Sequence, residues 1–180
     1  SVSIHRADCA RLLKLQEVAG GRIVEVEWGV SPRDNYEVDV AIEAYDRAIA
    51  ITPNLTFLHL RAGANYRRLA FDSPNETVQT ELYEKSLEYF DKTATINKQL
   101  DVEDPVPYLS IAKTYSQMGQ FFIAIRNVQR TIEFQPSKAE FYGELGVLYH
   151  KNRNYETGIL ALGCAVDGCT EEESCEGRGG

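Results

Sequence analysis

Histidine, cysteine and serine side chains can act as nucleophiles and bases, but their spacing in this chain does not assemble a catalytic site. The three histidines, His5, His59 and His150, lie on separate segments, whereas acid–base and nucleophilic catalysis need partners within hydrogen-bond reach. His5 and Cys9 are one helical turn apart, and such a pair on a helix surface is usually incidental. The sequence has no glycine-rich phosphate loop and no His-x-x-x-His pair. We therefore predict a protein that is not an enzyme, with no catalytic residues and no cofactor.

Cysteines are the second group of residues with chemical potential. One is Cys9, and the others, Cys164, Cys169 and Cys175, lie near the C-terminal end. No two are spaced as C-x-x-C, and a zinc site needs about four well-placed ligands, so we predict no metal site. Two interpretations stay open for the last three: they are buried or free thiols, or they form a disulfide among Cys164, Cys169 and Cys175. A disulfide would indicate an oxidising, extracytoplasmic setting.

Basic residues gather on one predicted helix. Residues 55–71 contain three arginines and no acid, in a chain whose formal net charge is −8. Beside Phe57 and Leu60, the strip formed by Arg67 and Arg68 would suit an acidic or carboxylate-bearing peptide. The alternative is that both arginines only oppose the dipole at the C-terminal end of a helix.

The composition limits the classes of protein that remain. A hydrophobic fraction of 43% and a charged fraction of 26% over 180 residues are ordinary for a globular protein. The net charge of −8 argues against a general nucleic-acid binder, which needs a basic surface to displace counterions. The apolar runs are short and interrupted by charges, so we expect no membrane insertion by this chain.

The positioning of all these residues depends on a repeat, with a period of about 34 residues, between Tyr108 and Thr170. Ile111-Ala112-x-x-Tyr115 becomes Leu145-Gly146-x-x-Tyr149, Phe121-x-x-Ala124 becomes Tyr155-x-x-Gly158, and Thr131 becomes Ala165. Small residues recur where two helices must touch, and large residues recur where a helix fills the gap between its neighbours. Such a period is the signature of stacked helical hairpins. The pattern predicts an all-α solenoid that works by binding.

The same residues carry a family resemblance. Their order resembles the tetratricopeptide repeat (TPR), in which a large residue, a small residue and a tyrosine mark the first helix. The second helix of that repeat carries an aromatic residue, small residues and a closing proline. The third unit of this chain reads Tyr108, Ile111-Ala112, Tyr115, Gly119, Phe121, Ala124, Val128, Thr131 and Pro136. The fourth reads Tyr142, Leu145-Gly146, Tyr149, Tyr155, Gly158, Leu162 and Ala165, without the proline.

The TPR pattern divides the chain 1–180 into about four hairpins within a single domain. Repeat one spans about 5–53 with an insertion at 20–35, and repeat two spans about 54–100. Repeats three and four span 105–138 and 139–170, and 171–180 is a loose tail. Ser73-Pro74-Asn75-Glu76 reads as a helix start with Ser73 as N-cap, so we predict one extended second helix over 74–97 in repeat two. Ser137 and Glu140 predict a capping box at the start of repeat four.

The resemblance also implies where a partner would bind, because the first helices of a TPR array line its concave groove. Helical spacing then selects the side chains that face the groove. We expect peptide binding by Phe57, Leu60, Arg67, Arg68, Leu109, Lys113, His150 and Lys151. The partner would be a protein or peptide, with an acidic one favoured by the cations. The alternative function is a structural spacer or a homo-oligomerisation module.

A weaker resemblance concerns the setting. The run from Asp104 to Tyr115, followed by Cys164-x-x-x-x-Cys169-Thr170, is similar to the extracytoplasmic TPR regions of bacterial membrane proteins, some of them O-antigen ligase- or polymerase-like. This resemblance implies an extracytoplasmic location at a bacterial membrane, with the cytoplasm as the alternative. It also implies that the chain is part of a longer protein.

Overall fold

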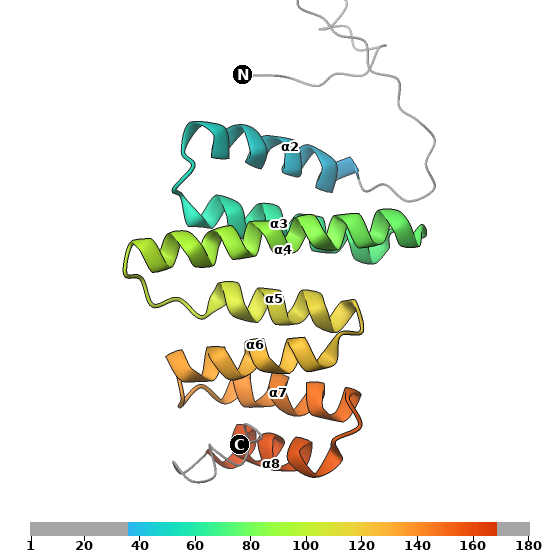
Figure 1. Ribbon diagram of the computed structural model, residues 1–180, viewed down its shortest axis with the longest axis vertical. Coiled ribbons are helices and arrows are strands. Elements are labelled where there is room, and N and C mark those ends of the chain that lie inside the picture. The colour runs from blue at the N-terminus through green and yellow to red at the C-terminus, as the bar shows by residue number, and fades with distance from the viewer. Residues whose placement is uncertain (1–35, 169–180) are drawn as a thin grey trace, which may run out of the picture. The chain divides into compact units, whose positions relative to one another are not determined.

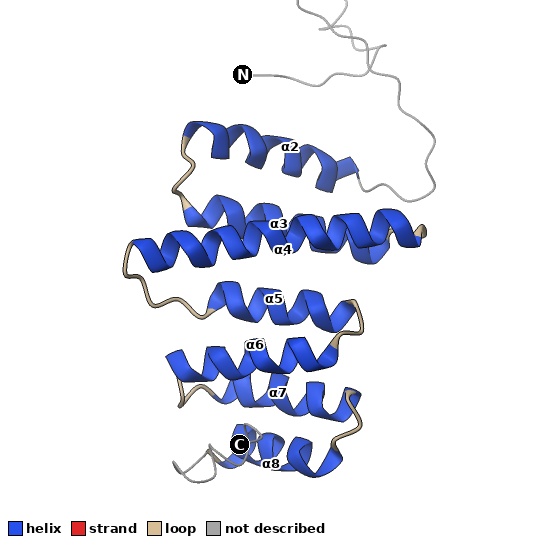
Figure 2. Ribbon diagram, viewed as in Figure 1, coloured by secondary structure: helices blue, strands red, loops and turns tan. Residues whose placement is uncertain are grey.

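The computed structural model describes residues 36–168, in which helices are joined by loops and turns, with no strand among these residues (Figure 2). The helices are α2 (Tyr36–Ile51), α3 (Thr56–Asp72), α4 (Glu76–Gln99), α5 (Val106–Gln117), α6 (Phe121–Phe134), α7 (Ala139–Lys151) and α8 (Tyr155–Asp167). Figure 1 shows them stacked in chain order. The prediction of an all-α stack of helical hairpins is confirmed. The predicted first helix of repeat one, the insertion at 20–35 and the tail at 171–180 lie outside the described residues.

The helices pair as hairpins, and the hairpins then pack side by side. The most extensive packing joins α3 to α4, α5 to α6 and α7 to α8. Contacts of α2 with α3, α4 with α5, and α6 with α7 join each hairpin to the next. Every helix packs mainly on the helices that precede and follow it in the chain. Most tertiary contacts therefore join residues that are close in sequence, as expected for a solenoid.

Small residues at the repeated positions bring the two helices of a hairpin together. A Cβ atom added to Gly146 would lie 2.5 Å from Cγ of Leu162, and one added to Gly158 would lie 3.2 Å from the carbonyl oxygen of Gly146. In the preceding hairpin, Ala112 and Ala124 are fully buried at the equivalent positions. Small residues therefore recur from one repeat to the next because the two helices of each hairpin approach closely at these positions.

Large apolar side chains fill the space between consecutive hairpins. One buried cluster extends from α5 to α8 and includes Phe141, Tyr142 and Leu145, each no more than 1% exposed. A second cluster joins Val38 and Ile42 on α2 to Tyr66 on α3. Burying such side chains is the main force that holds a repeat array together.

Two helix starts differ from the sequence-based expectation. The side chain of Asn75, and not that of Ser73, caps α4 by accepting hydrogen bonds from the backbone N–H groups of Thr77 and Val78. The structure has α4 at 76–99, whereas the pattern predicted 74–97. The capping box at Ser137 is also wrong, because α7 begins after Lys138 without a side-chain cap. Asparagine and serine are equally good N-caps, so residue type alone does not select between Ser73 and Asn75.

Candidate functional site

A cavity of about 250 Å³ opens on the side of the array that carries the first helices α3, α5 and α7. We call this cavity the groove. It combines apolar side chains with several charged ones. Its lining residues are Arg67, Leu109, Ala112, Lys113, Ser116, Gln117, Val128, Glu144, Val147, Leu148 and Lys151.

Helical periodicity explains why these side chains share one face. On α5, Leu109, Lys113 and Ser116 recur at intervals of three or four residues, and such residues lie one above another on a helix. Glu144, Val147 and Lys151 follow the same spacing on α7. Because α5 and α7 are both first helices of their hairpins, their matching faces line the same groove.

Two lysines of the groove already hold polar partners. The ammonium of Lys113 lies 2.9 Å from Oε1 of Glu144, which joins α5 to α7. The ammonium of Lys151 donates a hydrogen bond to Oγ of Ser116, also between α7 and α5, at 3.2 Å. Both contacts are at least partly exposed, and exposed ion pairs contribute only about 0–1 kcal/mol. A ligand carboxylate can therefore compete for these lysines at small cost.

Arg67 is the most enclosed cation of the groove. Its Nη1 donates a hydrogen bond to the backbone oxygen of Ser110 at 3.2 Å, and its guanidinium lies 5.8 Å from the ring centre of Phe90. Burial lowers the pKa of Arg67 from its ordinary value, while Tyr83 and Glu144 act in the opposite direction. An arginine stays protonated at physiological pH despite such a shift, so Arg67 brings a partly desolvated positive charge to the cavity.

The structure brings half of the eight predicted binding residues together. Arg67, Leu109, Lys113 and Lys151 line the groove, and the other four do not. The lining of the cavity gives no support to a binding role for those four residues, which rests on the sequence pattern alone. Phe57 is exposed beneath the guanidinium of Arg61, and His150 is exposed with its ring against that of Tyr155. Leu60 is half-buried on α3, and Arg68 is exposed there.

Glu144 is the charged groove residue that the sequence-based reasoning missed. In the register of the repeat, Lys113 corresponds to Val147, and Glu144 lies one helical turn before that position. A residue at this position faces the first helix of the preceding repeat, so an acid there can meet Lys113. The sequence therefore contains a signal for this ion pair. The sequence pattern also did not predict three buried lining residues, which belong to the hydrophobic core as well: Ala112, Val128 and Leu148.

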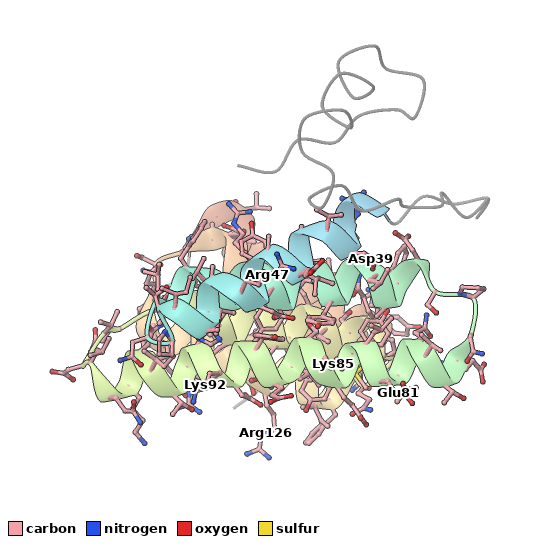
Figure 3. All side chains as sticks on the ribbon, turned by 90° about the horizontal axis from the view of Figure 1, so that it is seen from above. Asp39, Arg47, Glu81, Lys85, Lys92 and Arg126 are labelled. Atoms are coloured by element: carbon pink, nitrogen blue, oxygen red, sulfur yellow. The ribbon has the colours of Figure 1, made fainter. Side chains whose placement is uncertain are left out.

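A second and more open cavity, of about 640 Å³, lies between α3 and α4. Its lining includes the stacked rings of Tyr66 and Tyr89, whose centres are 5.4 Å apart, and the side chains of Lys85 and Lys92. Figure 3 shows both lysines on α4. His59 also lines it; its Nε2 donates to the carbonyl oxygen of Pro53 at 2.8 Å, and its buried Nδ1 has no hydrogen-bond partner in the described structure. Glu88 and Asp91 also line this cavity, so its two lysines are matched by two acids, whereas the groove has three cations and one acid.

The cysteines are only partly described. Cys164 is buried on α8, whereas Cys169 and Cys175 lie outside the described residues. The disulfide among them stays a prediction. Among the described residues, no group of three or more potential metal ligands converges.

The architecture defines a class, the solenoid of stacked helical hairpins, and comparison with known proteins defines the fold within it. No family model and no curated protein matches the sequence. Several solved structures match the fold at low identity, among them the following two. TTC0263, a thermophilic TPR protein in Thermus thermophilus, is 15% identical with a TM-score of 0.63, over 79% of this chain and 71% of that one. MamA MSR-1 C2 is 16% identical with a TM-score of 0.57, over 73% and 67% of the two chains.

The chain therefore has the tetratricopeptide repeat fold, as the residue pattern predicted. These matches give no support to the resemblance to O-antigen ligase-like proteins. Within the described range, no helix combines the length and the apolar character that crossing a bilayer requires.

Proposed function

We propose that this protein is a non-catalytic interaction scaffold that binds an acidic peptide segment in the groove formed by α3, α5 and α7. The observation that carries the proposal is the charge around the cavity. Arg67, Lys113 and Lys151 line it, and Glu144 is the only acid among its lining residues that the structure describes. This cationic site belongs to a chain whose formal net charge is −8.

The groove offers both of the interactions that such a peptide needs. A carboxylate between Lys113 and Lys151 would receive charge-assisted hydrogen bonds, which are about twice as strong as neutral ones. Leu109 and Val147, both part of the lining, would receive an adjacent apolar side chain. The positive charge of Arg67 would attract a carboxylate of the peptide more strongly than an exposed cation does, because Arg67 is partly removed from water.

The charge requirement is tested by reversing two groove lysines. A labelled peptide that alternates Asp or Glu with Leu is titrated against the full chain, and fluorescence anisotropy reports binding. We expect the Lys113→Glu, Lys151→Glu double variant to bind at least about tenfold more weakly, because it replaces two attractions with two repulsions. Higher salt should also weaken binding to the parent protein. Both substitutions leave Arg67 untouched, since reversing an enclosed charge would also disturb folding.

Arg68→Glu is the matched control, because Arg68 is an exposed cation of α3 outside the groove. It should leave the affinity within about twofold, as expected for a distant charge screened by salt. Glu144→Gln should tighten binding, because it removes the acid that competes for Lys113. Equal losses for Arg68→Glu and for the double lysine variant would contradict the groove as the binding site.

A further inference from the structure

The last described helix exposes an apolar stripe to solvent. Ile159, Leu162 and Val166 recur at helical spacing on α8, and they are 70%, 41% and 82% exposed. We call these three residues the α8 stripe. Isolated apolar residues at a surface are common, but a contiguous apolar face is typical of an interaction site.

The repeat itself supplies the reference for this face. One repeat earlier, the positions equivalent to the α8 stripe are Ile125, Val128 and Ile132 of α6. Those three are 4%, 1% and 0% exposed. They belong to the same buried cluster as Phe141 and Leu145 of α7, and α6 packs on α7. In this fold, therefore, an apolar stripe at these positions is covered by an amphipathic helix.

The outer face of a terminal repeat is ordinarily polar. Ile159, Leu162 and Val166 instead keep the residue types of an internal repeat. Residues 169–180 contain no Ala, Val, Ile, Leu, Met, Phe, Tyr or Trp. That segment lacks the side chains with which α7 covers α6.

Charge indicates what kind of helix fits. The α8 helix contains Glu156 and Asp167 and has no Lys, Arg or His. Both acids lie on exposed positions beside the stripe. A docking helix would therefore gain from basic residues next to its apolar face. We propose that the α8 stripe is a docking surface for an amphipathic α-helix of a partner protein, with basic residues flanking its apolar side chains.

The helix α7 provides a probe, because it covers the equivalent stripe within the molecule. The probe is a labelled peptide of residues 137–152 in which Glu140 and Glu144 are replaced by lysine. It is titrated against the full chain, with a second peptide in which Leu145 is also replaced by aspartate as the inactive form. We expect saturable binding of the first peptide, and at least about tenfold weaker binding of the second, since a central apolar anchor usually dominates such an interface.

Variants of the chain locate the binding surface. Ile159→Glu and Val166→Glu should each weaken peptide binding by about tenfold or more without loss of helicity, because both side chains are exposed. Leu160→Glu is the matched control. Leu160 is 49% exposed on the same helix, but it lies about 100° around the axis from Ile159. It should change binding by less than about twofold.

Several results would overturn the proposal. The absence of saturable binding would contradict the docking site. Equal losses of affinity for Leu160→Glu and Ile159→Glu would contradict its location on the α8 stripe. If the unmodified α7 peptide binds as tightly as the lysine form, the basic character of the partner is wrong. Sedimentation of the chain alone gives the remaining outcome: self-association that Ile159→Glu abolishes would make a second copy the occupant. Peptide binding should persist in the Lys113→Glu, Lys151→Glu variant, which separates this surface from the groove.

Discussion

Gly119 and Arg153 occupy the same left-handed position one repeat apart, in consecutive hairpins, with φ angles of +75° and +63°. The hydrogen bonds around them also correspond. The N–H of Gln120 donates to Tyr115 at 2.9 Å, and the N–H of Asn154 donates to Tyr149 at 2.9 Å. The two turns are therefore the same structure, although one has glycine and the other has a residue with a Cβ atom.

The strain at Arg153 leads to the first prediction. A non-glycine residue in the left-handed region costs roughly 1–2 kcal/mol, and glycine recovers only part of this because it is more flexible when unfolded. Arg153→Gly should therefore raise the free energy of unfolding by roughly 0.5–1 kcal/mol, measured by urea denaturation. Arg153→Ala keeps the Cβ atom and should not give this gain. A gain as large for alanine as for glycine would mean that the arginine side chain, and not the backbone, is unfavourable.

Gly63 leads to the second prediction, because a Cβ atom there would lie 2.7 Å from Cε1 of the buried Phe90. Gly63→Ala should destabilise the fold by roughly 1–3 kcal/mol, as overpacking in cores does. Gly143 is the matched helical glycine, where the nearest atom to an added Cβ is that of Ala165 at 3.9 Å. Gly143→Ala should be neutral or stabilising by up to about 1 kcal/mol. Chemical denaturation of both variants gives the comparison, and equal shifts would show that Phe90 yields freely.

The hydrogen bond from the hydroxyl of Tyr89 to the carboxylate of Asp46 predicts a dependence on alkaline pH. Burial raises the pKa of Tyr89 above its usual value, and the bond to Asp46 and the charge of that residue raise it further. The folded state therefore holds this proton more tightly than the unfolded state. Its stabilising effect is complete below about pH 10, the pKa of an unfolded tyrosine, and decreases as the pH rises above it.

Tyr89→Phe should accordingly lower the free energy of unfolding by roughly 1 kcal/mol at neutral pH. It should also make the alkaline loss of stability less steep, although Tyr66, Tyr83 and Tyr149, whose pKa values are raised as well, keep part of it. Urea denaturation at a series of pH values measures both effects. An unchanged alkaline slope would contradict the assigned role of Tyr89.

The start of α4 leads to the fourth prediction. The Oδ1 atom of Asn75 lies 2.9 Å from the N–H of Thr77 and 3.2 Å from that of Val78. Asn75→Ala should cost about 1 kcal/mol, the usual contribution of an N-cap. Ser73→Ala should cost less than about 0.5 kcal/mol, because the hydroxyl of Ser73 only reaches the carbonyl of Asn75 at 3.4 Å. Thermal or urea denaturation of the two variants measures the difference, and the reverse order would restore Ser73 as the cap.

The sequence predicted a feature correctly where a single residue type determines a single contact. The prediction failed where two nearby residues could fill the same role. The small residues at Ala112 and Gly146 predicted close helix pairs, and the structure has them at those positions. Ser73 and Asn75 are both good caps close together in the chain, so the choice between them depends on where the chain leaves α3. The residue type of Arg153 gave no sign of its left-handed backbone, which is imposed by the turn and is unfavourable for an arginine; only its register with Gly119 in the repeat pointed to it.

The candidate groove likewise combines features that the sequence predicted with features that only the tertiary structure revealed. The sequence by itself determined the class of fold, because small and large residues that recur in register at the TPR period allow only stacked helical hairpins. It also placed Lys113 and Lys151 on matching faces through helical spacing. Only the tertiary structure decided that Arg67 is enclosed while Arg68 is exposed, that Glu144 meets Lys113, and that Ile159 lacks the cover that Ile125 has. These outcomes depend on the rotation and distance between helices, which arise from packing across hairpins and not from the pattern within any one helix.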